Sequence, residues 1–183
     1  AYPSNASDAK GLLKMACRMN DPVLFMEHKG LYRQGYAATK EPDTDYILPF
    51  GKGRLVSKGK YLTLVTWGAM VQKSSEAVQE LDLKEDTVEI IDLRTLNPID
   101  FEILDTSIKK TGKVLIVHED NLTNGPGAEI AAIISNKYFE YLDGPIRRIA
   151  AKDSPIPFNW IIEEKILPQT KDILYAIEEL LEY

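Results

Sequence analysis

Residues that can do chemistry gather in one short stretch, residues 117–134, with the sequence VHEDNLTNGPGAEIAAII. An apolar, β-prone run leads into this stretch, and the apolar pattern of a helix ends it. The residues of interest between them are His118, Glu119, Asp120, Gly125 and Gly127. A strand, a glycine-bearing loop and a helix in this order form the framework of many phosphate-binding sites. The first question is therefore whether this loop binds a nucleotide.

The glycine pattern of the loop does not match a known phosphate-binding motif. A dinucleotide fingerprint requires three glycines in the order Gly-x-Gly-x-x-Gly, and a P-loop requires Gly-Lys followed by Ser or Thr. Only Gly125 and Gly127 are present, and Pro126 between them removes one amide donor. Glu129 places a negative charge in the first turn of the helix, where a phosphate would otherwise bind. We therefore interpret Gly125 and Gly127 as a structural strand-to-helix turn.

His118 and Glu119 stand at the carboxyl end of a predicted parallel strand, where open α/β sheets place their sites. No serine or cysteine partner and no metal-ligand spacing accompany them in the sequence. The favoured interpretation is structural, with His118 hydrogen-bonded at the strand end and Glu119 binding loop amides. The other histidine, His28, has no evident partner, and Glu27 is expected to form a structural ion pair with Lys29 or Arg33. No residue of this chain is predicted to be catalytic or to bind a cofactor.

Composition narrows the class of protein. The 183 residues carry a net charge of −6, which argues against a nucleic-acid partner. The single cysteine, Cys17, excludes an internal disulfide and a four-cysteine metal site. No apolar run reaches membrane-spanning length and no signal peptide is visible, so no membrane partner is expected. Because the chain begins at Ala1, we expect a processed or fragmentary protein.

The elements that position these residues divide the chain into two parts. Residues 37–50 are polar, contain two prolines and show no hydrophobic period, which indicates a linker. Before it, a helix is predicted over residues 8–19 and a buried strand over residues 21–28. One helix and one strand cannot close a hydrophobic core, so residues 1–36 are predicted to be the tail of another domain.

Strands alternate with helices after the linker, over residues 51–183. Apolar faces predict helices around Val71, Ala77, Val78 and Leu81, around Ile130, Ile134, Tyr138 and Tyr141, and around Ile173, Ile177, Leu180 and Leu181. Strands are predicted at residues 54–56, 61–67, 87–93, 113–119 and 146–150. Asn97 is predicted to start a further helix that Gly112 ends, and Thr170 to cap the last helix. This alternation predicts an α/β fold, an open and mostly parallel sheet covered on both faces.

A family resemblance rests on longer stretches taken in unbroken order. They are PSNASDAKGLL, DPVLFMEHKGLYR, LTLVTWGAMV, EIIDLRTLNPID, KKTGKVLIVHED, GAEIAA and DSPIPF. Together they resemble the beta subunit of thiamine-diphosphate-dependent 2-oxoacid dehydrogenases, in the transketolase-like family. The resemblance implies that residues 1–36 end a pyrimidine-binding domain. It also implies that residues 51–183 form a three-layer αβα domain with a five-stranded, mostly parallel sheet and one antiparallel strand.

The resemblance also implies a function. The chain is expected to be the C-terminal part of a decarboxylating component, with a branched-chain 2-oxoacid such as 2-oxoisovalerate as the favoured substrate of the parent enzyme. The alternatives are a pyruvate or acetoin dehydrogenase beta subunit, the C-terminal domain of transketolase or deoxyxylulose phosphate synthase, and a non-enzymatic assembly module. Thiamine diphosphate and magnesium belong to the parent enzyme and are not expected to bind this fragment, which we expect to be inactive alone.

The resemblance names partners and a compartment as well. An alpha subunit or region, a second beta subunit, and the basic subunit-binding domain of a dihydrolipoyl acyltransferase are expected. The acidic chain end is the expected docking surface for that domain, and its residues are Glu178, Glu179, Glu182 and Tyr183. Asp21 falls on a ligand position of a monovalent cation site found in some relatives, whereas Met19 replaces an acidic ligand. The expected compartment is the bacterial cytoplasm or the mitochondrial matrix.

Overall fold

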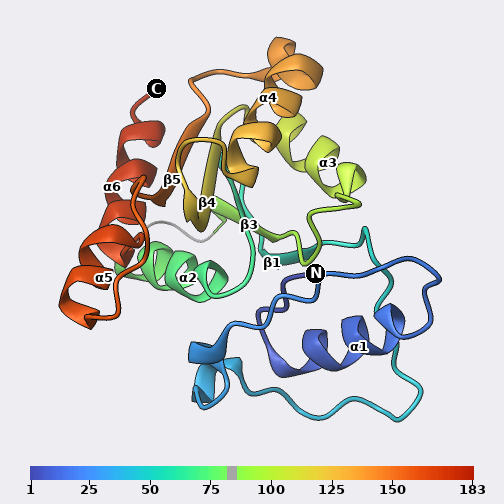
Figure 1. Cartoon of the computed structure of the whole chain (residues 1–183). Coiled ribbons are helices and arrows are strands. Elements are labelled where there is room, and N and C mark those ends of the chain that lie inside the picture. The colour runs from blue at the N-terminus through green and yellow to red at the C-terminus, as the bar shows by residue number, and fades with distance from the viewer. Residues whose placement is uncertain (82–85) are drawn as a thin grey trace.

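A five-stranded mixed sheet forms the centre of the computed structural model, which describes residues 1–81 and 86–183 (Figure 1). The strand order is β1-β3-β2-β4-β5. Strand β1 runs antiparallel to β3, and the pairs β2–β3, β2–β4 and β4–β5 are parallel. The strands are β1 (Arg54–Ser57), β2 (Leu62–Thr66), β3 (Val88–Asp92), β4 (Val114–Asn121) and β5 (Arg147–Ala151). All five predicted strands of this part are thus present.

Helices cover both faces of the sheet, which confirms the predicted three-layer αβα class. Helices α2 and α6 pack on one face in a core that includes Leu64, Ile90 and Ile177. Helices α3 and α4 pack on the other face, around Val65 and Ile116. The α-helices are α1 (Ala6–Ala16), α2 (Met70–Glu80), α3 (Phe101–Thr111), α4 (Pro126–Tyr138), α5 (Trp160–Ile166) and α6 (Thr170–Leu181). Short 3₁₀ turns are η1 (Lys29–Leu31), η2 (Gly35–Ala37) and η3 (Phe139–Tyr141).

The ends of two helices differ from the sequence prediction. Asp100, not Asn97, caps α3, because its carboxylate accepts the amide hydrogens at the start of the helix. Gly112 ends α3 as predicted, with a φ of 66° that favours glycine. At α6, Gln169 and Asp172 form a reciprocal capping box, so Thr170 is the first helical residue and not the cap.

Two further elements were predicted wrongly or not at all. Tyr141 lies beyond α4, in η3, and is 44% exposed, so it does not belong to the buried face of that helix. Helix α5 was not predicted; it is seven residues long and none of them is buried, so it has no buried apolar face of the kind on which the helix predictions were based. No helix among the described residues combines the length and the apolar composition needed to cross a membrane.

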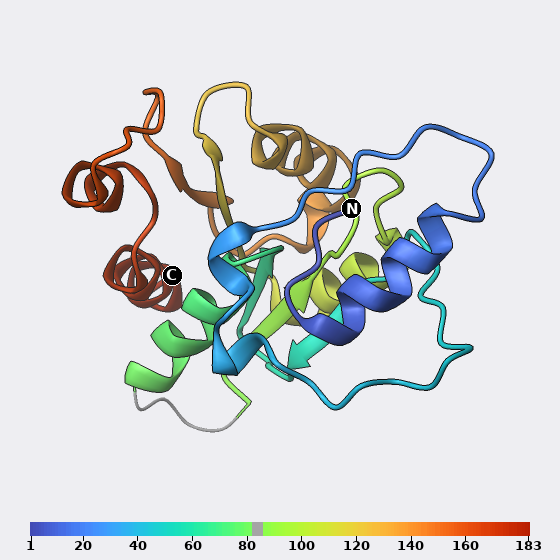
Figure 2. The same cartoon turned by 60° about the horizontal axis from the view of Figure 1, so that its bottom comes forward.

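The N-terminal part of the chain lies outside the three layers, next to the carboxyl ends of the strands (Figures 1 and 2). Helix α1 confirms the predicted first helix. The predicted buried strand at residues 21–28 is wrong, because Leu24 is 82% exposed and no strand forms there. The segment makes two backbone hydrogen bonds with Ala1, one through the carbonyl oxygen of Leu24 and one through the amide of Met26. A strand requires a neighbour along its whole length, and Ala1 provides one for a single residue.

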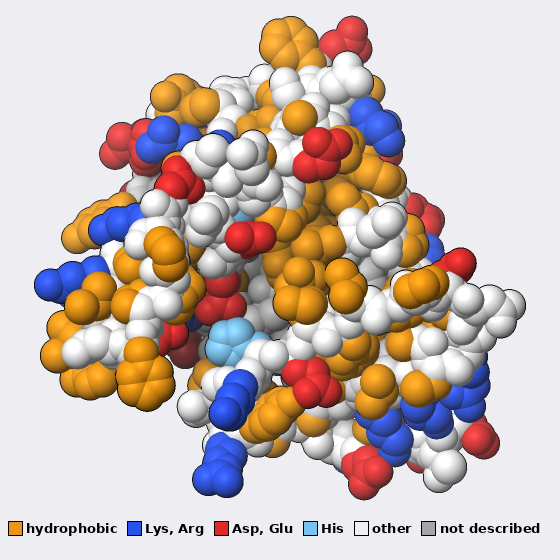
Figure 3. Space-filling model, in the orientation of Figure 1, with side chains coloured by type: hydrophobic (Ala, Val, Ile, Leu, Met, Phe, Trp, Pro, Cys, Tyr) orange, Lys and Arg blue, Asp and Glu red, His pale blue; other side chains and the backbone are white. Residues whose placement is uncertain are grey.

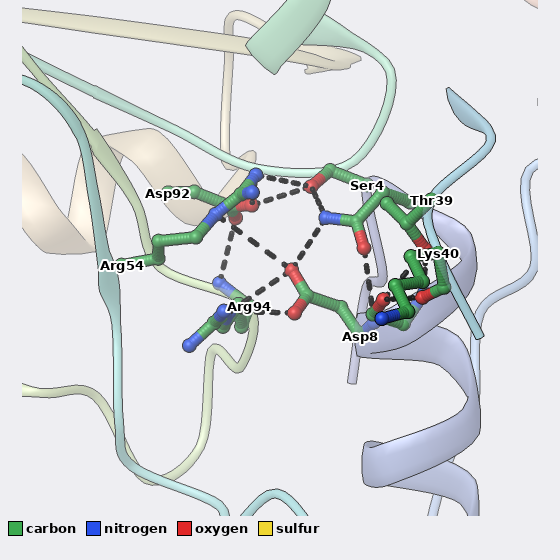
Figure 4. A network of polar contacts seen from close by, with 9 residues as sticks. Ser4, Asp8, Thr39, Lys40, Arg54, Asp92 and Arg94 are labelled. Atoms are coloured by element: carbon green, nitrogen blue, oxygen red, sulfur yellow. Dashed lines mark hydrogen bonds and ion pairs between the residues drawn. The ribbon is translucent and has the colours of Figure 1, made fainter. Parts of the chain in front are cut away.

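A buried ionic cluster attaches this N-terminal part to the sheet (Figure 4). Arg94 forms two hydrogen bonds with the carboxylate of Asp8, at 2.7 and 3.0 Å. Arg54 donates to Ser4 and to Asp92 at 3.1 and 3.2 Å, and the Ser4 hydroxyl donates to Asp92 as well. Burial raises the pKa of Asp92, and the hydrogen bond from Ser4 and the charge of Arg54 oppose that effect.

Arg94 adopts the left-handed backbone conformation that non-glycine residues rarely occupy, with a φ of 61°. Its amide donates to the Asp92 carboxylate at 3.0 Å, and its carbonyl accepts the amide of Tyr2 at 2.7 Å. The backbone strain is therefore held by contacts on both sides of the residue, which lies just beyond the end of β3.

We predict that Asp8→Ala destabilises the protein by about 3 kcal/mol, because it leaves the largely buried Arg94 guanidinium without its carboxylate. Urea denaturation measures this loss, and hydrogen exchange should show reduced protection of α1. The matched control is Glu41→Ala, which removes the exposed ion pair with Lys10. An equal loss of stability in both variants would contradict a special role for the cluster.

Candidate functional site

The carboxyl ends of β2 and β4 lie side by side in the sheet, since Thr66 pairs with Val117. The chain leaves β2 through α2 toward β3, and it leaves β4 through α4 toward β5. These helices lie on opposite faces. The two connections thus diverge from neighbouring strands, which is the topological switch point where open α/β sheets bind their ligands.

A crevice of about 160 Å³ opens at this switch point. The sheet domain contributes Trp67, Gly68, Glu119, Asp120 and Pro126 to its walls. The N-terminal segment contributes Tyr2, Met26, Glu27 and His28. The chain therefore covers its own switch point with a segment that is distant in sequence.

His28 and Glu119 form the polar link across this crevice. Nε2 of His28 lies 3.3 Å from Oε1 of Glu119, and both side chains are partly exposed. The hydrogen bond with Glu119 raises the pKa of His28, and partial burial opposes this effect. The prediction that His28 lacks a partner is wrong, because Glu119 is its partner. The sequence did not indicate this pair because the two residues are 91 positions apart.

Glu27 also differs from its prediction. Its carboxylate accepts the hydroxyl hydrogen of Tyr32, and no ion pair with Lys29 or Arg33 is present in the described residues. The one-turn helix η1 begins at Lys29 and brings Tyr32 back toward Glu27, which explains the choice of partner.

His118 is a buried wall of the turn and not an exposed acid–base group. It has no exposed surface, and its ring stacks on Trp67 with the centroids 5.2 Å apart and the planes within 7°. Burial lowers the pKa of His118 to about 4, so the ring is neutral at pH 7. Neither ring nitrogen makes a well-formed hydrogen bond with a described residue, which corrects the expected strand-end hydrogen bond.

Gly125 and Gly127 are required for space and not for an unusual backbone angle. Gly125 precedes α4 with a φ of −70° and Pro126 is the first helical residue. A Cβ on Gly127 would lie 2.5 Å from Cδ2 of His118 and closer still to Nε2. Glu129 lies in the first turn of α4 as predicted. This packing supports the interpretation of a structural turn.

The residues around the crevice do not suit a diphosphate. Its walls carry the carboxyl groups of Glu27, Glu119 and Asp120, which repel an anion. Pro126 supplies no amide hydrogen to the start of α4. Within residues 1–81 and 86–183, no group of three or more His, Cys, Asp or Glu side chains is arranged to hold a metal ion. Asp21 is exposed, and it lines a crevice together with Met19, the residue that stands in place of an acidic cation ligand.

The acidic residues of the last helix are exposed, as a docking surface requires, but one of them is already paired. Glu179 binds the guanidinium of Arg147 in β5. Glu178 and Glu182 form no ion pair with a described residue. Tyr183 is 65% exposed, and its Cβ lies close to Gly144. Most of the free negative charge of this surface therefore belongs to Glu178 and Glu182.

Trp67 and the Glu119–His28 pair were missed as site residues by reasoning from the sequence. A signal for Trp67 was present, because this residue directly follows β2, and His118 lies in the second half of the neighbouring strand β4. Residues at the carboxyl ends of neighbouring parallel strands meet at one edge of the sheet. The contribution of His28 had no comparable signal.

The family of this chain is shown by its similarity to known proteins. A family described as "Transketolase, C-terminal domain" matches residues 51–173, and the chain belongs to this family. "Pyruvate dehydrogenase E1 component subunit beta" of Staphylococcus epidermidis is 40% identical to it over 181 residues, which are 99% of this chain and 55% of that protein. The Staphylococcus aureus protein of the same name is 39% identical over the same length. The chain spans about half the length of these relatives, and the resemblance drawn from its motifs is confirmed.

Among solved structures, a protein titled "Split gene transketolase, inactive beta4 tetramer" superposes with a TM-score of 0.63. It is 27% identical to this chain and the match covers 76% of this chain and 44% of that one. The match supports the same fold class.

We predict opposite titration of the two histidines. In an NMR titration, His118 should stay neutral to about pH 4, whereas His28 should titrate above its ordinary value of 6.5. Between pH 6.5 and 4 the unfolded chain protonates at position 118 and the folded protein does not, so this residue lowers the free energy of unfolding as the pH falls. His28 stabilises the fold below pH 6.5, and this contribution is lost as the pH rises through its raised pKa.

The control for His118 is His118→Phe, which keeps a ring against Trp67 and removes the titration. For His28 the control is Glu119→Gln, which removes the negative partner. A coincident titration of both histidines near pH 6.5 would contradict the burial of His118 and the His28–Glu119 pair.

We predict that Gly127→Val destabilises the protein by about 3 kcal/mol, because the added side chain overlaps the His118 ring. The loss is measured by chemical denaturation. Gly127→Ala combined with His118→Ala should be less destabilising than the sum of the two single variants, because the second change removes the overlapping atoms. Additive losses would show that Gly127 serves another purpose.

Proposed function

We propose that this chain is the C-terminal part of the beta subunit of a thiamine-diphosphate-dependent 2-oxoacid dehydrogenase, and that it serves subunit assembly and docking of the acyltransferase. The observation that carries this proposal is the 40% identity that extends over both the N-terminal segment and the sheet domain. The covered switch point supports an assembly role, because the N-terminal segment takes the place that a ligand would use.

Pyruvate is the substrate that we propose for the parent enzyme. The relatives named above act, by their names, on pyruvate, and this favours the pyruvate alternative over 2-oxoisovalerate. Acetoin remains the other alternative within the same class. Since both relatives are bacterial, we propose the cytoplasm as the compartment.

The parent enzyme's thiamine diphosphate and magnesium are proposed to bind outside this chain. The acidic crevice and the proline-led helix start do not suit a diphosphate, so no step of the reaction is assigned to these residues. The proposed partners are an alpha subunit or region, a second beta subunit and the basic subunit-binding domain of the acyltransferase.

A second candidate is a transketolase assembled from separate chains. The match to a split-gene transketolase favours it, because that protein has the same fold and 27% identity. Its substrates would be sugar phosphates in place of 2-oxoacids.

An activity assay separates these candidates. The full-length parent of this chain, combined with its alpha partner, should reduce a dye with pyruvate and more slowly with 2-oxoisovalerate. Ketol transfer between sugar phosphates without 2-oxoacid oxidation would establish the transketolase alternative and contradict the proposed 2-oxoacid dehydrogenase function. This chain alone should show neither activity nor measurable binding of thiamine diphosphate in calorimetry, because the reacting groups must be positioned together.

We predict that Glu178→Lys with Glu182→Lys slows association with the acyltransferase's subunit-binding domain by about tenfold at low salt, and flattens its salt dependence. These acids are the unpaired ones, and four positions on a helix place them on one face. Stopped-flow association rates at several salt concentrations measure the effect. Asp43→Lys with Glu140→Lys is the charge-matched control on other surfaces. Equal association rates for the two double variants would show that Glu178 and Glu182 are only part of an ordinary solvated surface.

A further inference from the structure

Strand β5 forms one edge of the sheet. It pairs only with β4, from Arg147 onward, in the described residues. The other side of an edge strand presents backbone N–H and C=O groups that no neighbouring strand uses. Five residues form this strand, which is long enough to pair with an added segment.

A groove of about 610 Å³ runs along this edge. One wall is β5 with Arg148, Ile149 and Ala150, and the other is the connection from α5 to α6. The amide of Lys152, directly after β5, donates to the carbonyl of Ile166 at 3.1 Å, so α5 contacts the chain at the end of the strand. Leu122, which follows β4, borders the groove as well, so the groove extends from the free side of β5 to the end of β4.

Positive charge dominates the groove, although the whole chain has a net charge of −6. Lys152, Lys165 and Lys171 border it, and none of the three makes an ion pair with a described residue. Arg148 donates to the carbonyl of Leu122 and also interacts electrostatically with the carboxylate of Asp153, so its charge is partly offset. Two acids also border the groove, and the carboxylate of one of them, Asp172, is engaged in the capping box of α6.

An exposed apolar patch borders the groove through α5. Figure 3 shows hydrophobic side chains gathered over α5, with Lys and Arg side chains close by. Phe158 is fully exposed and Trp160 is 65% exposed. Exposed aromatic residues of this size are typical anchors of protein interfaces. The full patch consists of Ile156, Phe158, Trp160, Ile161 and Ile162.

We propose that this groove binds an extended acidic segment of another protein, which adds as a strand to the free edge of β5. Main-chain hydrogen bonds supply pairing, the lysines select acidic side chains, and the apolar patch holds the flanking residues. Lysines on an edge strand also protect sheets from unwanted pairing. Lys165 and Lys171, however, lie on the opposite wall, where they would face the added strand. This surface is distinct from the acidic end of α6, which suits a basic partner.

The test uses the 183-residue chain and a synthetic peptide of about seven residues in which Glu and Val alternate. Alternation places all Glu side chains on one side of the added strand. We expect amide shifts along residues 147–151 in NMR and new exchange protection at Arg148 and Ala150, whose amides face away from β4. Binding to Lys165→Glu with Lys171→Glu should be about tenfold weaker. Lys40→Glu with Lys58→Glu, on other surfaces, is the charge-matched control and should bind normally.

A second peptide, with alternate backbone nitrogens methylated, keeps the charge and loses the ability to pair as a strand. It should not bind. Equal binding of the methylated peptide would show that charge alone attracts it, and equal binding of inorganic polyphosphate would show a general anion surface. Either result overturns the proposal, as does the absence of binding at millimolar peptide or protection located elsewhere in the sheet.

Discussion

The pairing of Asp8 with Arg94 is the interaction on which the arrangement of the two parts of this chain depends. Both groups are almost fully withdrawn from water, and such a pair is held only when its remaining hydrogen-bonding capacity is also satisfied. Asn5 supplies a further donor to Asp8, and Asp92 accepts from Ser4, Arg54 and the Arg94 amide. The cluster therefore fixes the start of α1 against the end of β3, and it stabilises the left-handed backbone of Arg94.

The crevice at the switch point follows from this attachment. Once the first residues are fixed to β3, Ala1 holds the extended segment at Leu24 and Met26, and that segment carries His28 to Glu119. A position that α/β sheets ordinarily offer to a ligand is covered by protein. The acidic walls that remain disfavour a phosphate group, and the buried His118 beneath the turn is uncharged at neutral pH. These properties are those of a packing interface between the N-terminal segment and the sheet domain of this chain.

Sequence patterns predicted the sheet domain well, because its central strands β2 and β3 and most of β4 are buried on both faces. Residues such as Leu64, Ile90 and Ile116 lie in unbroken apolar runs, and Gly112 marks a helix end by a local backbone requirement. Predictions failed where the partner lies far along the chain. The apolar run at residues 21–28 has the composition of a strand, but pairing depends on a neighbour that no local pattern shows. The His28–Glu119 pair is hidden for the same reason.

The acidic residues at the end of α6 are unfavourable for the helix itself, as the helix dipole shows. A helix is stabilised by acidic residues near its start and basic residues near its end, each by about 0.3–1 kcal/mol. Asp172 follows this rule in the first turn, whereas Glu178, Glu179 and Glu182 oppose it at the other end. Burial of Ile173, Ile177 and Leu180 outweighs this local cost, and Arg147 offsets the charge of Glu179 alone. Lysines would solvate the same face equally well and would suit the helix dipole better. The needs of the helix itself therefore do not account for Glu178 and Glu182.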